Sequence, residues 1–126
     1  MPALEPVAGV RVVAAPAALD AARWSGDDVD VIRIAPDEAL GMGAIAVETS
    51  DPDAIVEPES GFSVALLGAA DLSRIAEHTE WRLPDKPGVL CQGKIAGVPA
   101  KLLTGEPALL VVQTAYADEL RGRLGW

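Results

Sequence analysis

Short apolar runs separated by turn residues are the feature that most constrains the fold of this chain. Each run is rich in valine, isoleucine, leucine or alanine, and proline, glycine and aspartate stand between the runs. Runs of this length and composition are typical of β-strands, and the intervening residues are typical of turns. We therefore predict strands over residues 7–14, 28–35, 38–47, 62–68, 89–103 and 108–116.

Turn chemistry predicts how some of these strands are joined. Pro36-Asp37-Glu38 predicts a hairpin between 28–35 and 38–47, and the TGEP turn at 104–107 predicts another between the last two strands. Within 89–103, the glycines and Pro99 predict a bend or bulge, with Pro99 on an edge strand. The proline- and carboxylate-rich segment 48–61 is predicted to be the one long connection, in which only residues 54–56 are expected to pair.

Three segments have helical patterns. A short helix is predicted over 16–24, where Pro16 suits the first helical position. In 69–81, Leu72, Ile75, Ala76 and Thr79 recur at the spacing of one helical face. The terminal segment 115–126 is predicted to be an amphipathic helix, because apolar residues repeat every four positions and arginines follow acids.

These elements predict one domain over residues 1–126, since a chain of 126 residues has the usual size of a single domain. Strands outnumber helices and come mostly in hairpins, and each helix must bury one apolar stripe. The predicted class is α+β: an antiparallel sheet with two or three helices packed on one face, in a ferredoxin-like arrangement.

Charge and composition exclude several classes of function. A net charge of −9 repels phosphate backbones and anionic lipids, which argues against nucleic-acid and membrane-surface binding. No apolar run approaches the roughly 20 residues of a membrane span. The amino terminus has no secretory pattern, and a single cysteine forms no internal disulfide; both observations favour a cytoplasmic protein.

The only cysteine, Cys91, and the only histidine, His78, are the candidate catalytic residues. A thiol nucleophile with histidine as its base needs the two side chains within hydrogen-bonding distance of each other. Cys91 stands at the start of a predicted strand with no helix amino terminus after it to lower its pKa, and a cysteine in such a position is typically a small buried hydrophobe. One histidine and one cysteine are also too few for structural zinc.

Two further patterns partly match known binding motifs, one for dinucleotides and one for calcium. GMGAIA, residues 41–46, fits a variant dinucleotide fingerprint, but no helix follows it, so its glycines are interpreted as hairpin irregularities. The carboxylates of 48–59 lack the spacing of an EF-hand loop and are interpreted as a solvated connection. The sequence thus predicts no cofactor and no metal.

Three stretches that lie within roughly residues 29–124 carry a resemblance: VIRIAPDEALGMG, AIVEPESGFSVALLGAADLSRIAEHTEW and GKIAGVPAKLLTGEPALLVVQTAYADELRGRL. They resemble the small gamma subunit of heterotetrameric sarcosine oxidase, which is similar in turn to the folate-binding domain of aminomethyltransferases. The resemblance implies an accessory subunit that packs on a larger, cofactor-bearing partner and does no chemistry itself. No folate- or flavin-contacting motif can be matched onto this chain.

The sequence therefore leaves three functions open. The first is a non-catalytic protein-binding module, acting by self-association or within an oxidoreductase complex. The second is a small thiol-dependent enzyme that uses Cys91 and His78, and the third is a module that binds a small, folate-like ligand. For the first, apolar content of 50% predicts surplus apolar surface. The candidate interface residues are Leu4, Val7, Trp24, Trp81 and Trp126.

Overall fold

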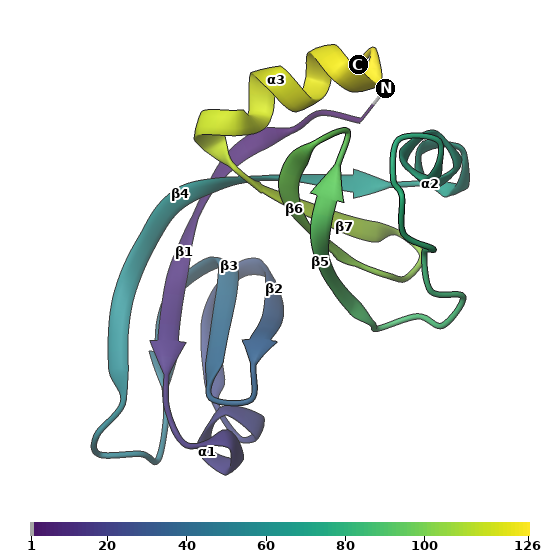
Figure 1. Cartoon of the computed structure of the whole chain (residues 1–126). Coiled ribbons are helices and arrows are strands. Elements are labelled where there is room, and N and C mark those ends of the chain that lie inside the picture. Colours follow the sequence, from purple (N-terminus) through teal and green to yellow (C-terminus); the bar gives the residue numbers. More distant parts are fainter. Residues whose placement is uncertain (1) are drawn as a thin grey trace. The chain divides into compact units, whose positions relative to one another are not determined.

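A computed structural model describes residues 2–126 of the chain, which form seven strands and three helices (Figure 1). Strands hold 51% of the residues and helices 19%. The strands are β1 (Glu5–Val13), β2 (Arg23–Ala35), β3 (Glu38–Glu48), β4 (Ile55–Leu67), β5 (Leu90–Ile95), β6 (Val98–Leu103) and β7 (Ala108–Gln113). The helices are α1 (Pro16–Asp20), α2 (Ala69–Ala76) and α3 (Thr114–Leu124).

The strands are hydrogen-bonded in the order β2-β3-β1-β4-β7-β6-β5. The pairs β1–β3, β2–β3, β4–β7, β5–β6 and β6–β7 are all antiparallel. The chain divides into two compact units. One is Val7–Ser60, and the other consists of the residues up to Pro6 together with Gly61–Trp126.

The unit Val7–Ser60 is built around the β2–β3 hairpin and β1. Small apolar side chains dominate its core cluster, including Val12 at 0% exposure and Ala39 at 1%. The indole ring of Trp24 packs closely over Gly41. A Cβ atom on that glycine would lie only 2.4 Å from the ring. The register between β2 and β3 shifts around Gly26, and Gly43 has a φ of 86°. The interpretation of GMGAIA as an irregular hairpin strand is therefore confirmed.

The larger unit buries one face of the β4–β7–β6–β5 strands under α2 and α3. Leu102, Leu110, Ile75 and Leu120 form part of one core cluster and are each 0% exposed. Leu4 belongs to the same cluster at 2% exposure, and the Arg121 guanidinium donates a hydrogen bond of 2.6 Å to its carbonyl oxygen. Apolar residues from the two ends of the chain therefore share this core.

The predicted ferredoxin-like α+β class is wrong. The protein is mostly antiparallel sheet with short helices, and α1 has only five residues. A ferredoxin-like fold needs helical crossovers between strands. Here hairpins join β2 to β3, β5 to β6, and β6 to β7. Propensity favoured helix over 16–24, but that pattern ends at Asp20 and the chain has entered β2 by Arg23.

Two other element assignments also differ from the predictions. The segment 48–61 was predicted to be a connection, yet β4 begins at Ile55 and continues through Pro58. The predicted strand 89–103 is two strands, because Ala96 and Gly97, with φ of 50° and 79°, turn the chain between β5 and β6. Pro99 consequently lies in β6, between β5 and β7, and not on an edge.

Candidate functional site

The candidate site is an apolar groove in the larger unit, formed by two adjoining hollows. The first has a volume of about 460 Å³ and the second about 410 Å³. Leu72 of α2, Gly105 and Glu106 line both hollows, so the two are parts of one groove. The remaining walls are mainly leucine and proline: Leu83, Pro84, Pro87 and Leu102 in the first hollow, and Leu67 and Pro107 in the second.

Thr104, at the end of β6, fixes one wall of this groove. Its Oγ1 accepts a hydrogen bond of 2.8 Å from the Val89 N–H and donates one of 2.6 Å to the Lys86 carbonyl. Its backbone N–H donates to the Val89 carbonyl at 2.9 Å, and its carbonyl accepts from the Gly88 N–H at 2.8 Å. These bonds hold the proline-containing loop 82–89 against the end of β6, which keeps Leu83, Pro84 and Pro87 in place.

The loop is also fixed at its start. The Trp81 indole N–H donates a hydrogen bond of 3.0 Å to the Lys94 carbonyl of β5, and the Ala96 N–H donates one of 2.8 Å to the His78 carbonyl. Trp81 lies over Gly93, where a Cβ would be 2.8 Å from Nε1. The segment after α2 is thus bonded along β5, so the groove is built on a backbone that is hydrogen-bonded at both ends of the loop.

Few charged residues line the groove, and one of them, Glu106, lies where the two hollows meet. Glu106 is exposed on the part shared by the two hollows, and no ion pair among residues 2–126 includes it. Asp85 and Lys86 line the first hollow, and Asp85 forms an ion pair of 3.8 Å with Arg82. An apolar groove with a central carboxylate is suited to a ligand that carries a cationic group between apolar groups.

The structure places Cys91 and His78 in separate settings. Cys91 is the second residue of β5, opposite Leu102, and packs against the core cluster of the larger unit. Burial raises the pKa of the Cys91 thiol, which lowers the fraction of nucleophilic thiolate. Among residues 2–126, no hydrogen bond joins the side chains of Cys91 and His78, and the His78 carbonyl oxygen accepts a hydrogen bond from the Ala96 N–H. This arrangement gives no support to a catalytic dyad.

Four of the five candidate interface residues pack at least partly against a core cluster of the chain. Leu4 is in the core, and Trp81 and Trp126 are half-buried against the same cluster. Trp24 is half-buried against the other core, and Val7 is half-exposed on β1. The most exposed large apolar side chain is instead Ile45, at 81%.

The acidic segment after β3 has a structural role at Asp51. Its carboxylate accepts hydrogen bonds from the N–H groups of Ala15, at 2.8 Å, and Asp53, at 2.9 Å. These two bonds lower the pKa of Asp51. Within residues 2–126, no group of three or more histidine, cysteine, aspartate or glutamate side chains is arranged to hold a metal ion.

Comparisons with protein-family models and with curated proteins find no match to this chain. In the part of the chain that the structure describes, no helix combines the length and apolar character of a transmembrane helix.

Sequence reasoning did not select the residues that form the groove. Leu83 and Leu102 were assigned to a loop and a strand, and Thr104 to a turn, without a common site. Two prolines in 83–88 and the TGEP turn were visible signals of two neighbouring loops. The side chain of Thr104 joins these two loops by hydrogen bonds. That contact depends on the register of the hairpin, which the sequence did not specify.

Proposed function

We propose that this protein is a non-catalytic binding module whose groove holds a segment of a partner protein. The observation that carries the proposal is the continuity of the two apolar hollows across Leu72 and Glu106. An extended segment with an apolar side chain for each hollow, and a lysine or arginine between them, would match both the groove walls and its central carboxylate. The overall charge of −9 also favours a basic partner surface.

Peptide selection on the full-length protein tests this proposal. We expect selected peptides to share an apolar–basic–apolar pattern. The substitution Glu106→Gln should lower the affinity of these peptides about tenfold or more, because it removes a charge-assisted hydrogen bond. The substitution Leu72→Asp should abolish their binding. Ile45→Ser is the control, because Ile45 is exposed and belongs to the other unit. Peptides without the pattern, or equal loss in the Ile45 variant, would contradict the proposal.

The resemblance to the gamma subunit of sarcosine oxidase supports a particular kind of partner. We propose that the partner is a larger, cofactor-bearing oxidoreductase subunit, so that this chain is an accessory subunit. Native mass spectrometry of the protein taken from its own cell extract tests that assignment. A companion flavoprotein supports it, whereas a bare monomer counts against both a partner protein and self-association.

A small ligand is the second candidate occupant. The first hollow alone, at about 460 Å³, has the volume of a typical small-molecule site, for which the usual range is about 300–1,000 Å³. In the same native mass spectra, a retained small mass that is lost in Leu72→Asp supports this candidate. Protein without such a mass argues against it.

A further inference from the structure

A third hollow lies on the opposite face of the same strands and does not belong to the groove. Its volume is about 230 Å³, and its walls include Phe62, Lys94, Pro99 and Lys101. Lys101 pairs with Gln92 on β5 and with Val111 on β7, so these side chains share one face. The neighbouring residues Ala100 and Leu102 point to the other face, into the core.

The two lysines are close neighbours on this face. Lys94 pairs with Pro99, and Lys101 lies two residues beyond Pro99 on the same strand. Such diagonal neighbours in antiparallel strands have Cα atoms about 7–8 Å apart. No aspartate or glutamate is among the residues lining the hollow. Two lysine residues therefore line one small hollow whose lining includes no carboxylate.

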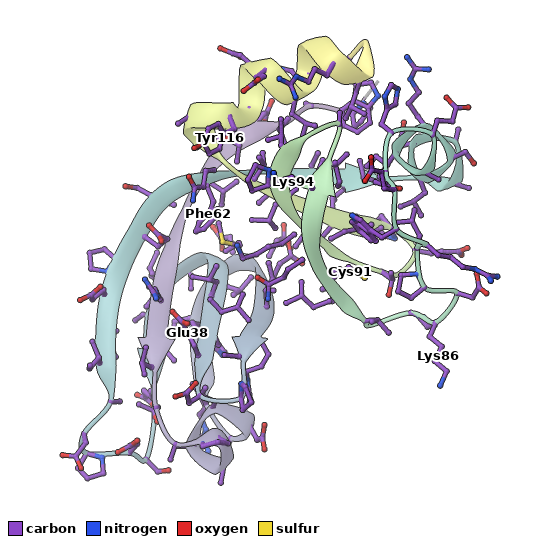
Figure 2. All side chains as sticks on the ribbon, in the orientation of Figure 1. Glu38, Phe62, Lys86, Cys91, Lys94 and Tyr116 are labelled. Atoms are coloured by element: carbon purple, nitrogen blue, oxygen red, sulfur yellow. The ribbon has the colours of Figure 1, made fainter. Side chains whose placement is uncertain are left out.

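The other cations of the protein are arranged differently. Among residues 2–126, ion pairs with carboxylates include every arginine except Arg23, and none of these pairs includes a lysine. Lys86 is on the loop of the groove and projects away from the sheet (Figure 2). In a protein with a net charge of −9, Lys94 and Lys101 thus form a local cationic site without a paired carboxylate.

The hollow is also partly preorganised. The Lys101 ammonium lies 5.2 Å from the centroid of the Phe62 ring, an arrangement in which the ring face attracts the cation. The backbone of Lys94 is fixed because its carbonyl accepts the Trp81 indole N–H. Val111, on the same face, is only 1% exposed and provides a rigid apolar surface beside Lys101.

We propose that this hollow binds a small doubly charged anion, with one ammonium group from each of Lys94 and Lys101. Its volume is below the range of about 300–1,000 Å³ that is usual for larger organic ligands, which restricts the ligand to a compact anion. Lysine provides rotatable point charges and no planar fork, so it suits either a phosphate group or a pair of carboxylates. Inorganic phosphate and succinate are the probes that distinguish these two chemistries.

Calorimetric titration of the full-length protein with each probe, at constant ionic strength set by chloride, tests the site. We expect at least one probe to bind, and Lys94→Gln and Lys101→Gln each to weaken it by at least about tenfold, because each removes one of two charge-assisted contacts. Arg23→Gln is the matched control, since it removes one positive charge from an exposed residue of the other unit that lines neither the groove nor this hollow. The affinity of this control variant for the probe should equal that of the unmodified protein.

Each result has one interpretation. Binding of phosphate alone assigns a phosphate group, binding of succinate alone assigns a dicarboxylate, and binding of both leaves the common dianion site in place. The proposal is overturned if neither probe binds, if only one of the two lysine substitutions weakens binding, or if Arg23→Gln weakens binding by a comparable amount. Thermal unfolding of each variant without the probes checks that the substitutions leave the fold intact.

Discussion

Replacing Gly93 by alanine tests the packing that fixes the loop after α2. The new Cβ would lie 2.8 Å from Nε1 and 3.1 Å from Cε2 of Trp81. Carbon atoms in good contact are about 3.5–4.0 Å apart, so the indole must move by roughly 0.5–1 Å. That movement stretches the 3.0 Å hydrogen bond from the indole to the Lys94 carbonyl beyond a useful length.

The expected decrease in the free energy of unfolding follows from these contacts. Overpacking costs about 1–3 kcal/mol and the lost hydrogen bond about 1 kcal/mol. Alanine in a strand recovers about 0.5–1 kcal/mol relative to glycine, because the unfolded chain has less conformational freedom to lose. We therefore expect Gly93→Ala to lower the free energy of unfolding by about 1–3 kcal/mol, which corresponds to a melting temperature roughly 4–12 °C lower for a chain of this size.

Urea and thermal unfolding followed by circular dichroism measure this change. Gly122→Ala is the control, because Gly122 lies in α3 and a Cβ there meets nothing within 4 Å. It should raise the free energy of unfolding by about 0.5–1 kcal/mol. The double substitution of Gly93 and Trp81, to alanine and leucine, should cost less than the sum of its parts. A Gly93→Ala protein as stable as the unmodified one would refute this account of Trp81.

Two further predictions concern the titrating groups. Because burial raises the pKa of Cys91, iodoacetamide should modify it more slowly than free cysteine at neutral pH; faster modification would restore the thiol-enzyme hypothesis. The lowered pKa of Asp51 means that its ionised form stabilises the fold above the ordinary value of 3.8, and that this contribution is lost as the pH falls through the lower folded value. Asp51→Asn should therefore destabilise the protein at pH 7 and make little difference near pH 2, in unfolding measured at both; an equal difference at both would contradict this role.

The sequence predicted strands better than the architecture that joins them. The predicted strand 38–47 and the helix 115–126 lie within one residue or two of β3 and α3. Both have strong local signals, a proline turn before the strand and an apolar repeat in the helix. The predicted fold class was wrong because it depended on where strands begin and end in segments with weak local sequence signals. Residues 57–60 were assigned to the connection because of their proline and acids, although they lie in β4.

The candidate site was less predictable than the fold because it depends on register. Two glycines near 93–97 predicted a bulge, whereas a hairpin at Ala96 and Gly97 brings Lys101 opposite Gln92. A one-residue difference in that pairing would exchange the two faces of β6. The hollow that Lys94 and Lys101 share follows only from the observed strand pairing.

The register of β6 also explains how one strand contributes side chains to both the apolar groove and the cationic hollow. Leu102 points toward the core cluster and lines the apolar groove, whereas Lys101 points to the opposite face and lines the cationic hollow. A strand of six residues, held on both sides by β5 and β7, thereby fixes both surfaces at once. Substitutions on one face leave the other face's side chains in place, because the backbone hydrogen bonds are unchanged. Binding at the groove and binding at the hollow should therefore be separable by point substitutions, with Glu106→Gln affecting only the first and Lys101→Gln only the second.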